Sequence, residues 1–154
     1  INYNFSPVVD MSANQTVGFR SFGAKPENII PWSNAFIQET QRNNILATAK
    51  HFPGHGDTEN DSHYTLPVIQ HPANRIWDID LYPYQRLFKE NLMSVMVAHL
   101  NVPSLSQGTG LPTSLSKPVV TDLLQKRMNF KGLIFTDALN MRGVTIKNKP
   151  GEVD

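Results

Sequence analysis

The residues from Ile45 to His63 combine an apolar run with a dense group of titratable side chains. The run ILATA leads to Lys50 and His51, and the chain then breaks at Pro53 and Gly54. The loop beyond carries five further titratable residues: His55, Asp57, Glu59, Asp61 and His63. A buried strand does not end in so many polar groups without polar partners at its tip, because burying an unpaired charge is costly. We therefore predict that this loop belongs to an active site.

Asp61 and His63 lie two residues apart in that loop, a spacing that lets the carboxylate orient the imidazole. A carboxylate partner fixes the tautomer of a histidine and raises its basicity, which suits a proton shuttle near neutral pH. The alternative is a solvated polar loop with no catalytic role. The D-x-H spacing alone does not distinguish the two.

Asp137 ends the apolar run LIFTD, which is too apolar to hold a carboxylate in its middle. A carboxylate at the tip of such a strand can act as a nucleophile, a general base or a metal ligand. The alternative is a structural role, in which Asp137 caps a helix over residues 138–141. We expect Asp137 to have the functional role.

Three other polar residues at strand ends or in glycine-flanked loops are candidate ligand contacts. Lys50 needs a ligand hydroxyl or carboxylate, or else an ion pair with Asp10 or Asp137. Arg20 lies in GFRSFG and either binds a ligand or forms an ion pair within the loop. Asp10 ends the run NFSPVVD and likewise either contacts a ligand or forms an ion pair. His99 ends a fourth run, and we expect a hydrogen-bonded core histidine there rather than a catalyst.

A metal site is the weaker interpretation of the same loop. His51, His55, Asp57, Asp61 and His63 could supply ligands to zinc or magnesium. Their spacings match no usual zinc signature, and the sequence contains no HExxH motif. We expect neither a metal nor another cofactor.

Four short apolar runs that each end in a titratable residue predict strands buried on both faces, as in a parallel sheet. These runs are Asn4–Asp10, Ile45–His51, Ser94–His99 and Gly132–Asp137. Helical patterns lie between them, over Glu27–Asn43, around residues 81–88 and over residues 119–128 with Ser116 as N-cap. In the first helix the expected apolar face consists of Ile29, Ile30, Trp32, Phe36 and Ile37. This alternation predicts an α/β architecture.

Chemistry contributed by the carboxyl ends of several strands is typical of a (β/α)8 barrel of the TIM type. A doubly wound sheet is disfavoured, because no glycine-rich phosphate motif follows any strand. A complete barrel takes about 250 residues, so this chain of 154 residues predicts a partial barrel, about strands 3 to 7. We expect residues 1–154 to be part of one catalytic domain, truncated at both ends, with the remainder of the barrel as its partner.

The composition excludes several other function classes. The formal net charge is +1 without a basic block, so we expect no nucleic-acid partner. No apolar run approaches the roughly 20 residues of a membrane helix, and the chain has no cysteine. These features fit an ordinary globular domain.

The motif KHFPGHGDTENDSH resembles the acid/base loop of family 3 glycoside hydrolases in the branch of β-N-acetylglucosaminidases (NagZ-like). NFSPVVD resembles the family's third-strand motif, RSFG the loop after it, and LIFTDALNM the nucleophile strand. The resemblance covers essentially the whole chain, and the long loop motif is the most specific part of it.

This resemblance implies retaining hydrolysis by double displacement. Asp137 would attack the anomeric carbon, while His63, oriented by Asp61, would protonate the leaving oxygen and then activate water. The resemblance also implies that four residues hold the sugar hydroxyls and the N-acetyl group: Arg20, Lys50, His51 and Asp10. The expected substrate is a small glycan with terminal β-linked N-acetylglucosamine, such as a peptidoglycan fragment in a bacterial cytoplasm or periplasm.

Two departures from the family pattern bear on these expectations. Ala138 follows Asp137 where the commonest motif has a second acid, but the carboxylate remains at the nucleophile's position. The family's earlier strand and final strand are absent, so we expect this fragment alone to be inactive. The alternatives are a β-glucosidase-like or phosphate-using member of the family, and a non-catalytic carbohydrate-binding fragment.

Overall fold

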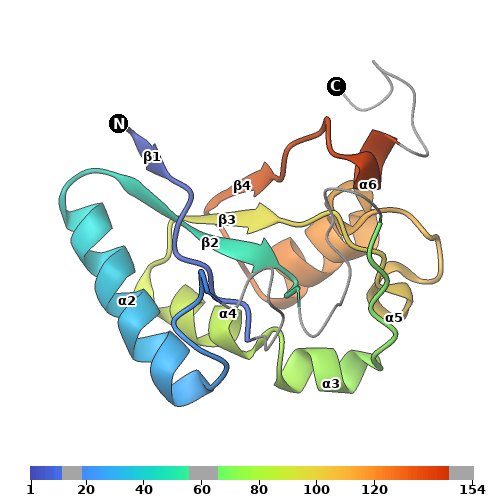
Figure 1. Ribbon diagram of the computed structural model, residues 1–154, viewed down its shortest axis with the longest axis horizontal. Coiled ribbons are helices and arrows are strands. Elements are labelled where there is room, and N and C mark those ends of the chain that lie inside the picture. The colour runs from blue at the N-terminus through green and yellow to red at the C-terminus, as the bar shows by residue number, and fades with distance from the viewer. Residues whose placement is uncertain (12–18, 56–65, 146–154) are drawn as a thin grey trace.

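The computed structural model of the chain describes residues 1–11, 19–55 and 66–145 (Figure 1). Its strands are β1 (Tyr3–Asn4), β2 (Leu46–Phe52), β3 (Ser94–Val97) and β4 (Leu133–Thr136). Its α-helices are α2 (Pro26–Arg42), α3 (Ala73–Asp78), α4 (Tyr82–Leu87), α5 (Pro103–Ser106) and α6 (Arg142–Thr145). Three further helical segments are η1 (Phe88–Glu90), η2 (Thr113–Leu115) and the π-helix η3 (Pro118–Arg127).

The strands form one parallel sheet in the order β1-β2-β3-β4, which confirms the expected α/β class. The expected strand at Asn4–Asp10 is regular only at Tyr3–Asn4, because Pro7 has no amide hydrogen to donate to a ladder. The segment still follows β2, since the amides of Thr48 and Lys50 donate to the carbonyls of Ser6 and Pro7. All four strands therefore end at the same edge of the sheet.

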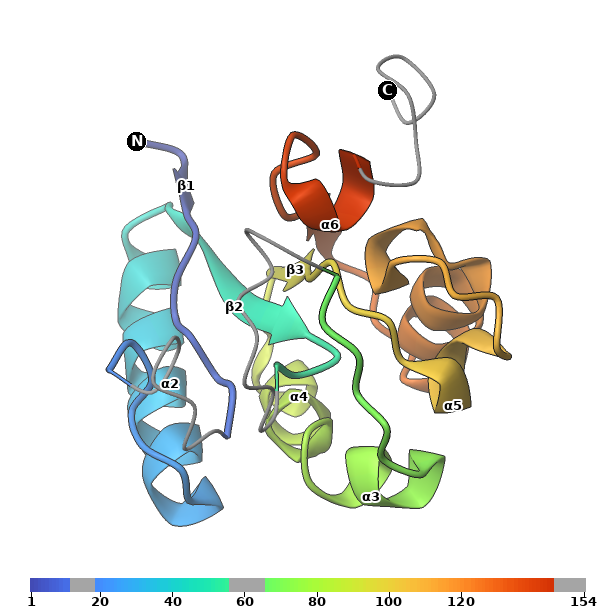
Figure 2. The same cartoon turned by 45° about the vertical axis from the view of Figure 1, so that its right-hand side comes forward.

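Helices α2 and α4 lie side by side, and α2 packs against β2 (Figure 1). In Figure 2, α2 flanks the strands on one side and η3, in orange, on the other. The buried stripe of α2 is Ile29, Ser33 and Ile37, at intervals of four residues. The prediction that Trp32 belongs to this stripe is wrong, because its side chain is 63% exposed.

The third expected helix forms as η3, but its N-cap differs from the prediction. Ser116 is buried, and its backbone carbonyl, not its side chain, accepts the amides of Val119 and Val120. The structure shows no side-chain capping bond at this helix. The hydrogen bond from the amide of Met128 to the carbonyl of Leu123 follows the wider π-type spacing.

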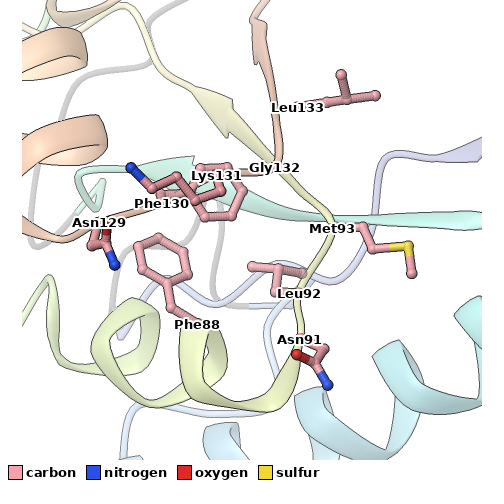
Figure 3. A pocket seen from close by; sticks show the side chains of 9 residues that line it. All are labelled: Phe88, Asn91, Leu92, Met93, Asn129, Phe130, Lys131, Gly132 and Leu133. Carbon is pink, nitrogen blue, oxygen red and sulfur yellow. The ribbon is translucent and has the colours of Figure 1, made fainter.

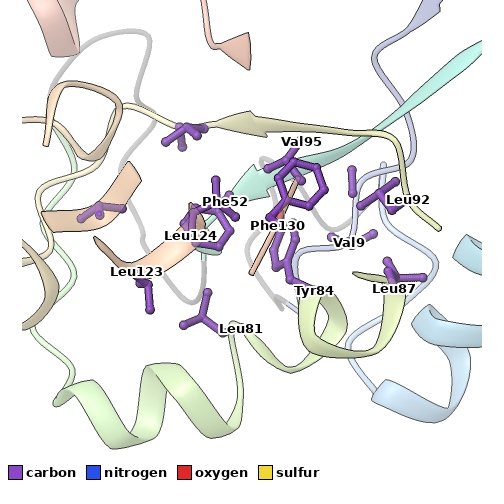
Figure 4. Close-up of a cluster of buried hydrophobic side chains, with 14 of the residues drawn as sticks. Val9, Phe52, Leu81, Tyr84, Leu87, Leu92, Val95, Leu123, Leu124 and Phe130 are labelled. Carbon is purple, nitrogen blue, oxygen red and sulfur yellow. The ribbon is translucent and has the colours of Figure 1, made fainter. Parts of the chain in front are cut away.

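The core lies between the sheet and these helices (Figure 4). Phe52 of β2 meets Tyr84 of α4 edge to face, with 5.2 Å between the ring centroids. Phe88 stacks on Phe130 at 4.6 Å and so ties the end of α4 to the connection before β4. This packing fixes β2, β3 and β4 relative to one another.

The sheet is curved like part of a barrel. Phe135 of β4 contacts the rings of Tyr3 and Phe5 at centroid distances of 5.6 and 5.3 Å. Tyr3 is in β1 and Phe5 directly follows it, and a flat sheet would hold β1 and β4 about 14 Å apart. Curvature brings them together across the concave face, as expected for a partial TIM-type barrel.

The helices of the described residues are all too short or too polar to cross a lipid bilayer.

Candidate active site

The candidate residues at the strand ends gather at one edge of the sheet. Lys50 and His51 are among the last three residues of β2, Asp137 directly follows β4, and His99 follows β3 by two residues. Asp10 joins them, because the amide of Val9 donates to the carbonyl of Lys50. Parallel strands bring their carboxyl ends together in this way, which is where barrels carry their chemistry.

Asp10 lies beneath the loop that follows β2, with its side chain fully buried. Its Oδ2 accepts a hydrogen bond from Nδ1 of His51 at 2.8 Å, and its Oδ1 accepts one from the backbone amide of His55 at 2.8 Å. The amide of His51 lies 3.2 and 3.3 Å from the two oxygens. Both oxygens of Asp10 thus face protein donors, and the expected direct contact of Asp10 with a sugar stays a prediction.

The environment of Asp10 keeps its carboxylate ionised. Burial is the largest single effect and acts to raise the pKa of Asp10, but the electrostatic interactions and hydrogen bonds with His51 and His55 together outweigh it, so the pKa is lowered overall. Asp10 is therefore a buried anion that these donors stabilise.

Lys50 lies half-buried among charges of both signs. Burial and the nearby Arg20 guanidinium lower its pKa, while Asp137 and Asp10 act in the opposite direction. Among the described residues no carboxylate lies within ion-pair distance of its ammonium. The structure thus brings Lys50, Arg20 and Asp137 into one electrostatic environment without pairing the lysine.

Arg20 and Lys50 share the lining of a cavity of about 410 Å³. Residues 6–8, Phe22 and Phe36 complete the lining. Two cations beside two aromatic rings suit an oxygen-rich ligand with an apolar face, as a sugar has.

Asp137 is the partly exposed carboxylate of the group. Its backbone amide donates to the carbonyl of Val97 at 2.9 Å, which continues the β3–β4 ladder to this residue. Its Oδ1 accepts the amide of Ala138 at 2.8 Å. The ladder fixes the backbone of Asp137, and the Ala138 amide restricts its side chain, so the carboxylate is held at the strand tip.

His99 is a core histidine with both ring nitrogens bonded, in agreement with the expectation. Its Nε2 lies 3.0 Å from the carbonyl of Ala138 and must donate to it, so Nδ1 accepts the hydroxyl of Ser114 at 2.7 Å. Burial lowers the pKa of His99 below that of a free histidine. His99 supports the backbone after Asp137 and is itself not presented to a ligand.

Asp61 and His63, the expected acid/base dyad, lie outside the described residues, as does Asp57. The described segment before them ends at His55, whose ring contacts that of His51 edge to face at 5.6 Å.

Gly54 and Asp80 support this segment, and local sequence reasoning did not single them out for that role. Gly54 has a φ of 130°, and a Cβ there would lie 2.7 Å from Cβ of Asp80. Asp80 is buried and pairs with Arg75 at 3.0 Å. The Pro-Gly pair signals a turn, but the contact with Asp80 is long-range and leaves no local pattern.

A second cavity of about 580 Å³ lies at the opposite end of the sheet, where β3 and β4 begin (Figure 3). Its lining includes Phe88, Phe130 and Met93. None of the candidate site residues that the structure describes lines this cavity.

The model of the glycosyl hydrolase family 3 N-terminal domain matches residues 1–153. Similar curated proteins include beta-hexosaminidase A of Pseudoalteromonas piscicida, 34% identical over 94% of this chain, and beta-hexosaminidase of Actinobacillus pleuropneumoniae serotype 3, 36% identical over 93%. The matched part is 26% and 41% of those proteins, so the chain spans less than half the length of either relative.

The fold is also found in solved structures. A family 3 β-N-acetylglucosaminidase from Paenibacillus superposes with a TM-score of 0.90 at 33% identity, covering 96% of this chain and 28% of that one. NagZ from Neisseria gonorrhoeae superposes with a TM-score of 0.83 at 32% identity, covering 91% and 41%. With a family match over nearly every residue and a curved parallel sheet that carries its polar residues at the strand ends, this chain belongs to the glycosyl hydrolase family 3 N-terminal domain family.

Proposed function

We propose that the protein containing this chain is a retaining glycoside hydrolase that removes terminal β-linked N-acetylglucosamine. The observation that carries the proposal is the position of Asp137. It is a partly exposed carboxylate at the tip of β4, in the same electrostatic environment as Lys50 and Arg20. The names of the similar proteins, beta-hexosaminidase and β-N-acetylglucosaminidase, support the choice of sugar.

The proposed mechanism has two displacements. Asp137 attacks the anomeric carbon and the glycosidic bond breaks, which forms a covalent glycosyl-enzyme. His63, oriented by Asp61, gives a proton to the departing oxygen and later takes one from the attacking water. Arg20, Lys50 and His51 hold sugar hydroxyls, so the anomeric carbon stays aligned with the carboxylate.

Small glycans such as peptidoglycan fragments are the proposed natural substrates. The likeness to NagZ supports this class, and the 410 Å³ cavity beside Arg20 and Lys50 fits a group of sugar size.

The proposal is tested by hydrolysis of p-nitrophenyl β-N-acetylglucosaminide with the full-length protein. Asp137→Asn should lower kcat by roughly three orders of magnitude or more, as loss of a catalytic nucleophile does in other hydrolases. Asp122→Asn is the matched control, because Asp122 is exposed on η3 and pairs with Lys126. Full activity in Asp137→Asn would contradict the proposal, and sugar binding without turnover in the wild type would favour a binding module.

A phosphate-using activity is the second candidate. A β-glucoside phosphorylase, BglX, superposes on this chain with a TM-score of 0.90 at 30% identity, covering 97% of this chain and 29% of that one. In that case phosphate would attack the glycosyl-enzyme in place of water. The two are separated by product analysis in phosphate buffer, where a sugar 1-phosphate indicates phosphorolysis and free N-acetylglucosamine indicates hydrolysis.

A further inference from the structure

Asp10 is a carboxylate enclosed by the segment that carries a proposed sugar contact. Its side chain is fully buried, and that of His51 is 7% exposed. Two backbone amides and one ring nitrogen, spread over residues 51–55, point at its two oxygens. A buried charge persists only when it is compensated in this way.

The bond from His51 decides which ring nitrogen carries the proton. The ionised carboxylate of Asp10 can only accept, so Nδ1 of His51 must donate to it across 2.8 Å. In the neutral ring, Nε2 then keeps its lone pair. Among the described residues the structure shows no hydrogen bond to this Nε2, which leaves it able to accept a bond from a ligand hydroxyl.

The backbone of the same segment is fixed from two sides. The carboxylate of Asp10 holds the amides of His51 and His55, which lie at the two ends of the segment. Between them, Gly54 passes against Asp80 with no room for a Cβ. The ring of His51 therefore has a defined backbone position as well as a defined tautomer.

We propose that Asp10 is a positioning residue that sets the Nδ1–H tautomer of His51 and fixes residues 51–55, so that Nε2 accepts a sugar hydroxyl. This inference rests on the proposed function for the identity of the ligand. It replaces a direct sugar contact by Asp10 with an indirect role through His51.

Asp10→Asn in the full-length protein is the informative variant. The asparagine has the same shape, but its NH2 group must face one of the donors that the carboxylate accepts, so at least one bond is lost. We expect kcat/KM for p-nitrophenyl β-N-acetylglucosaminide to fall about 10- to 100-fold, the range for partners that orient a ligand-binding histidine in metal sites. Most of the change should appear as a higher KM.

Thr48→Val is the matched control for general destabilisation. Thr48 is buried on the same strand, and its hydroxyl bonds that of Ser94 at 2.7 Å. The control should lower Tm but leave kcat/KM within about twofold. A comparable loss of kcat/KM in both variants at equal loss of Tm would overturn the positioning role, since general destabilisation would then explain it.

A double-mutant cycle tests whether Asp10 acts through His51. In a His51→Ala background, Asp10→Asn should cost much less than in the wild type, because the two side chains act as a unit. An unchanged cost in that background would overturn the role through His51.

The tautomer is tested without any variant of Asp10. The 15N spectrum of histidine-labelled wild type, assigned by the signal lost in His51→Gln, should show protonated Nδ1 and unprotonated Nε2 at neutral pH. A proton on Nε2, with or without one on Nδ1, would overturn the inference, because a protonated Nε2 cannot accept a hydrogen bond. This measurement needs no substrate, so it tests the tautomer independently of the proposed function. The proposed function is tested separately by the turnover of the wild type.

Discussion

Lys50 is a cation whose position is better explained by ligand binding than by stability. Burial and Arg20 lower its pKa, which means that the fold disfavours its charged form. No described carboxylate lies within ion-pair distance to offset that cost. A group that destabilises the free protein and faces a cavity is typical of a binding site.

Lys50→Met in the full-length protein should therefore raise Tm and weaken sugar binding together. The methionine removes the half-buried charge but keeps most of the apolar stem, whereas the ligand loses a charge-assisted hydrogen bond. Loss of such a bond corresponds to a rise in KM of about 10- to 100-fold. Thermal denaturation and the kinetics of p-nitrophenyl β-N-acetylglucosaminide measure the two effects.

Lys126→Met is the control, because Lys126 is exposed on η3 and pairs with Asp122 at 2.8 Å. It should change neither KM nor Tm appreciably. A lower Tm in Lys50→Met, with KM unchanged, would show that Lys50 is structural.

His99 should make the stability of the protein depend on pH. Burial lowers its pKa, so the unfolded chain takes up a proton at a higher pH than the folded protein does. The stability from a neutral His99 is thus fully present above about pH 6.5 and is lost as the pH falls toward and through the lower pKa of the folded state.

His99→Gln provides the comparison for this pH dependence. Glutamine does not titrate and should cost about 1–3 kcal/mol at pH 7 through imperfect bonds to Ser114 and Ala138. Urea denaturation at pH 7 and pH 5 should show the difference between wild type and variant shrinking at pH 5. A difference that grows toward pH 5 would contradict the pKa direction.

At the scale of elements, the periodicity of the sequence predicted the strands and helices but not all their details. Consecutive apolar residues in Ile45–His51 and Gly132–Asp137 correctly indicated β2 and β4. Most of β2 is buried, whereas the expected burial of β4 on both faces is not found, since Leu133 is 48% exposed. The shortening of β1 follows locally from Pro7, which has no amide hydrogen to donate, whereas the exposure of Trp32 depends on neighbours far along the chain.

The sequence predicted which residues lie at strand ends, but it did not predict how deeply each of them is buried. Asp10 and Asp137 both end apolar runs, so the sequence presents them alike. The structure separates them, since the loop after β2 covers Asp10 while Asp137 stays partly exposed. A local pattern identifies a strand end, but it does not say which loop folds over it.

Gly132 directly precedes β4 at a position where a side chain does not fit. A Cβ there would collide with the backbone carbonyl of Met93, which belongs to the start of the neighbouring strand. Since backbone cannot easily move aside, Gly132→Ala should destabilise the full-length protein by about 2–4 kcal/mol in urea denaturation.

Gly108→Ala separates this collision from ordinary glycine effects. Gly108 has a φ of 72° but no atom within 4 Å of a Cβ, so its substitution should cost only about 1–2 kcal/mol. Equal losses in the two variants would contradict the close approach of β3 and β4.

In the molecule as a whole, the described sheet is curved, and its candidate site residues lie at the carboxyl ends of the strands. The contacts of Phe135 with Tyr3 and Phe5 cross the concave face, and Tyr3 and Phe5 remain 47% and 45% exposed. Exposed aromatic rings on the inner face of an arc suit a barrel in which further strands complete the wall. We propose that activity requires that complete barrel.

The covalent bond that we propose between Asp137 and the sugar can be trapped and located. The full-length protein is incubated with a fluorinated N-acetylglucosaminyl fluoride, which forms the glycosyl-enzyme faster than water releases it. We expect a mass increase of one sugar, located on Asp137 by peptide mapping. A label on another residue would contradict the role of Asp137 as nucleophile. So would an Asp137→Asn variant that hydrolyses p-nitrophenyl β-N-acetylglucosaminide as fast as the wild type.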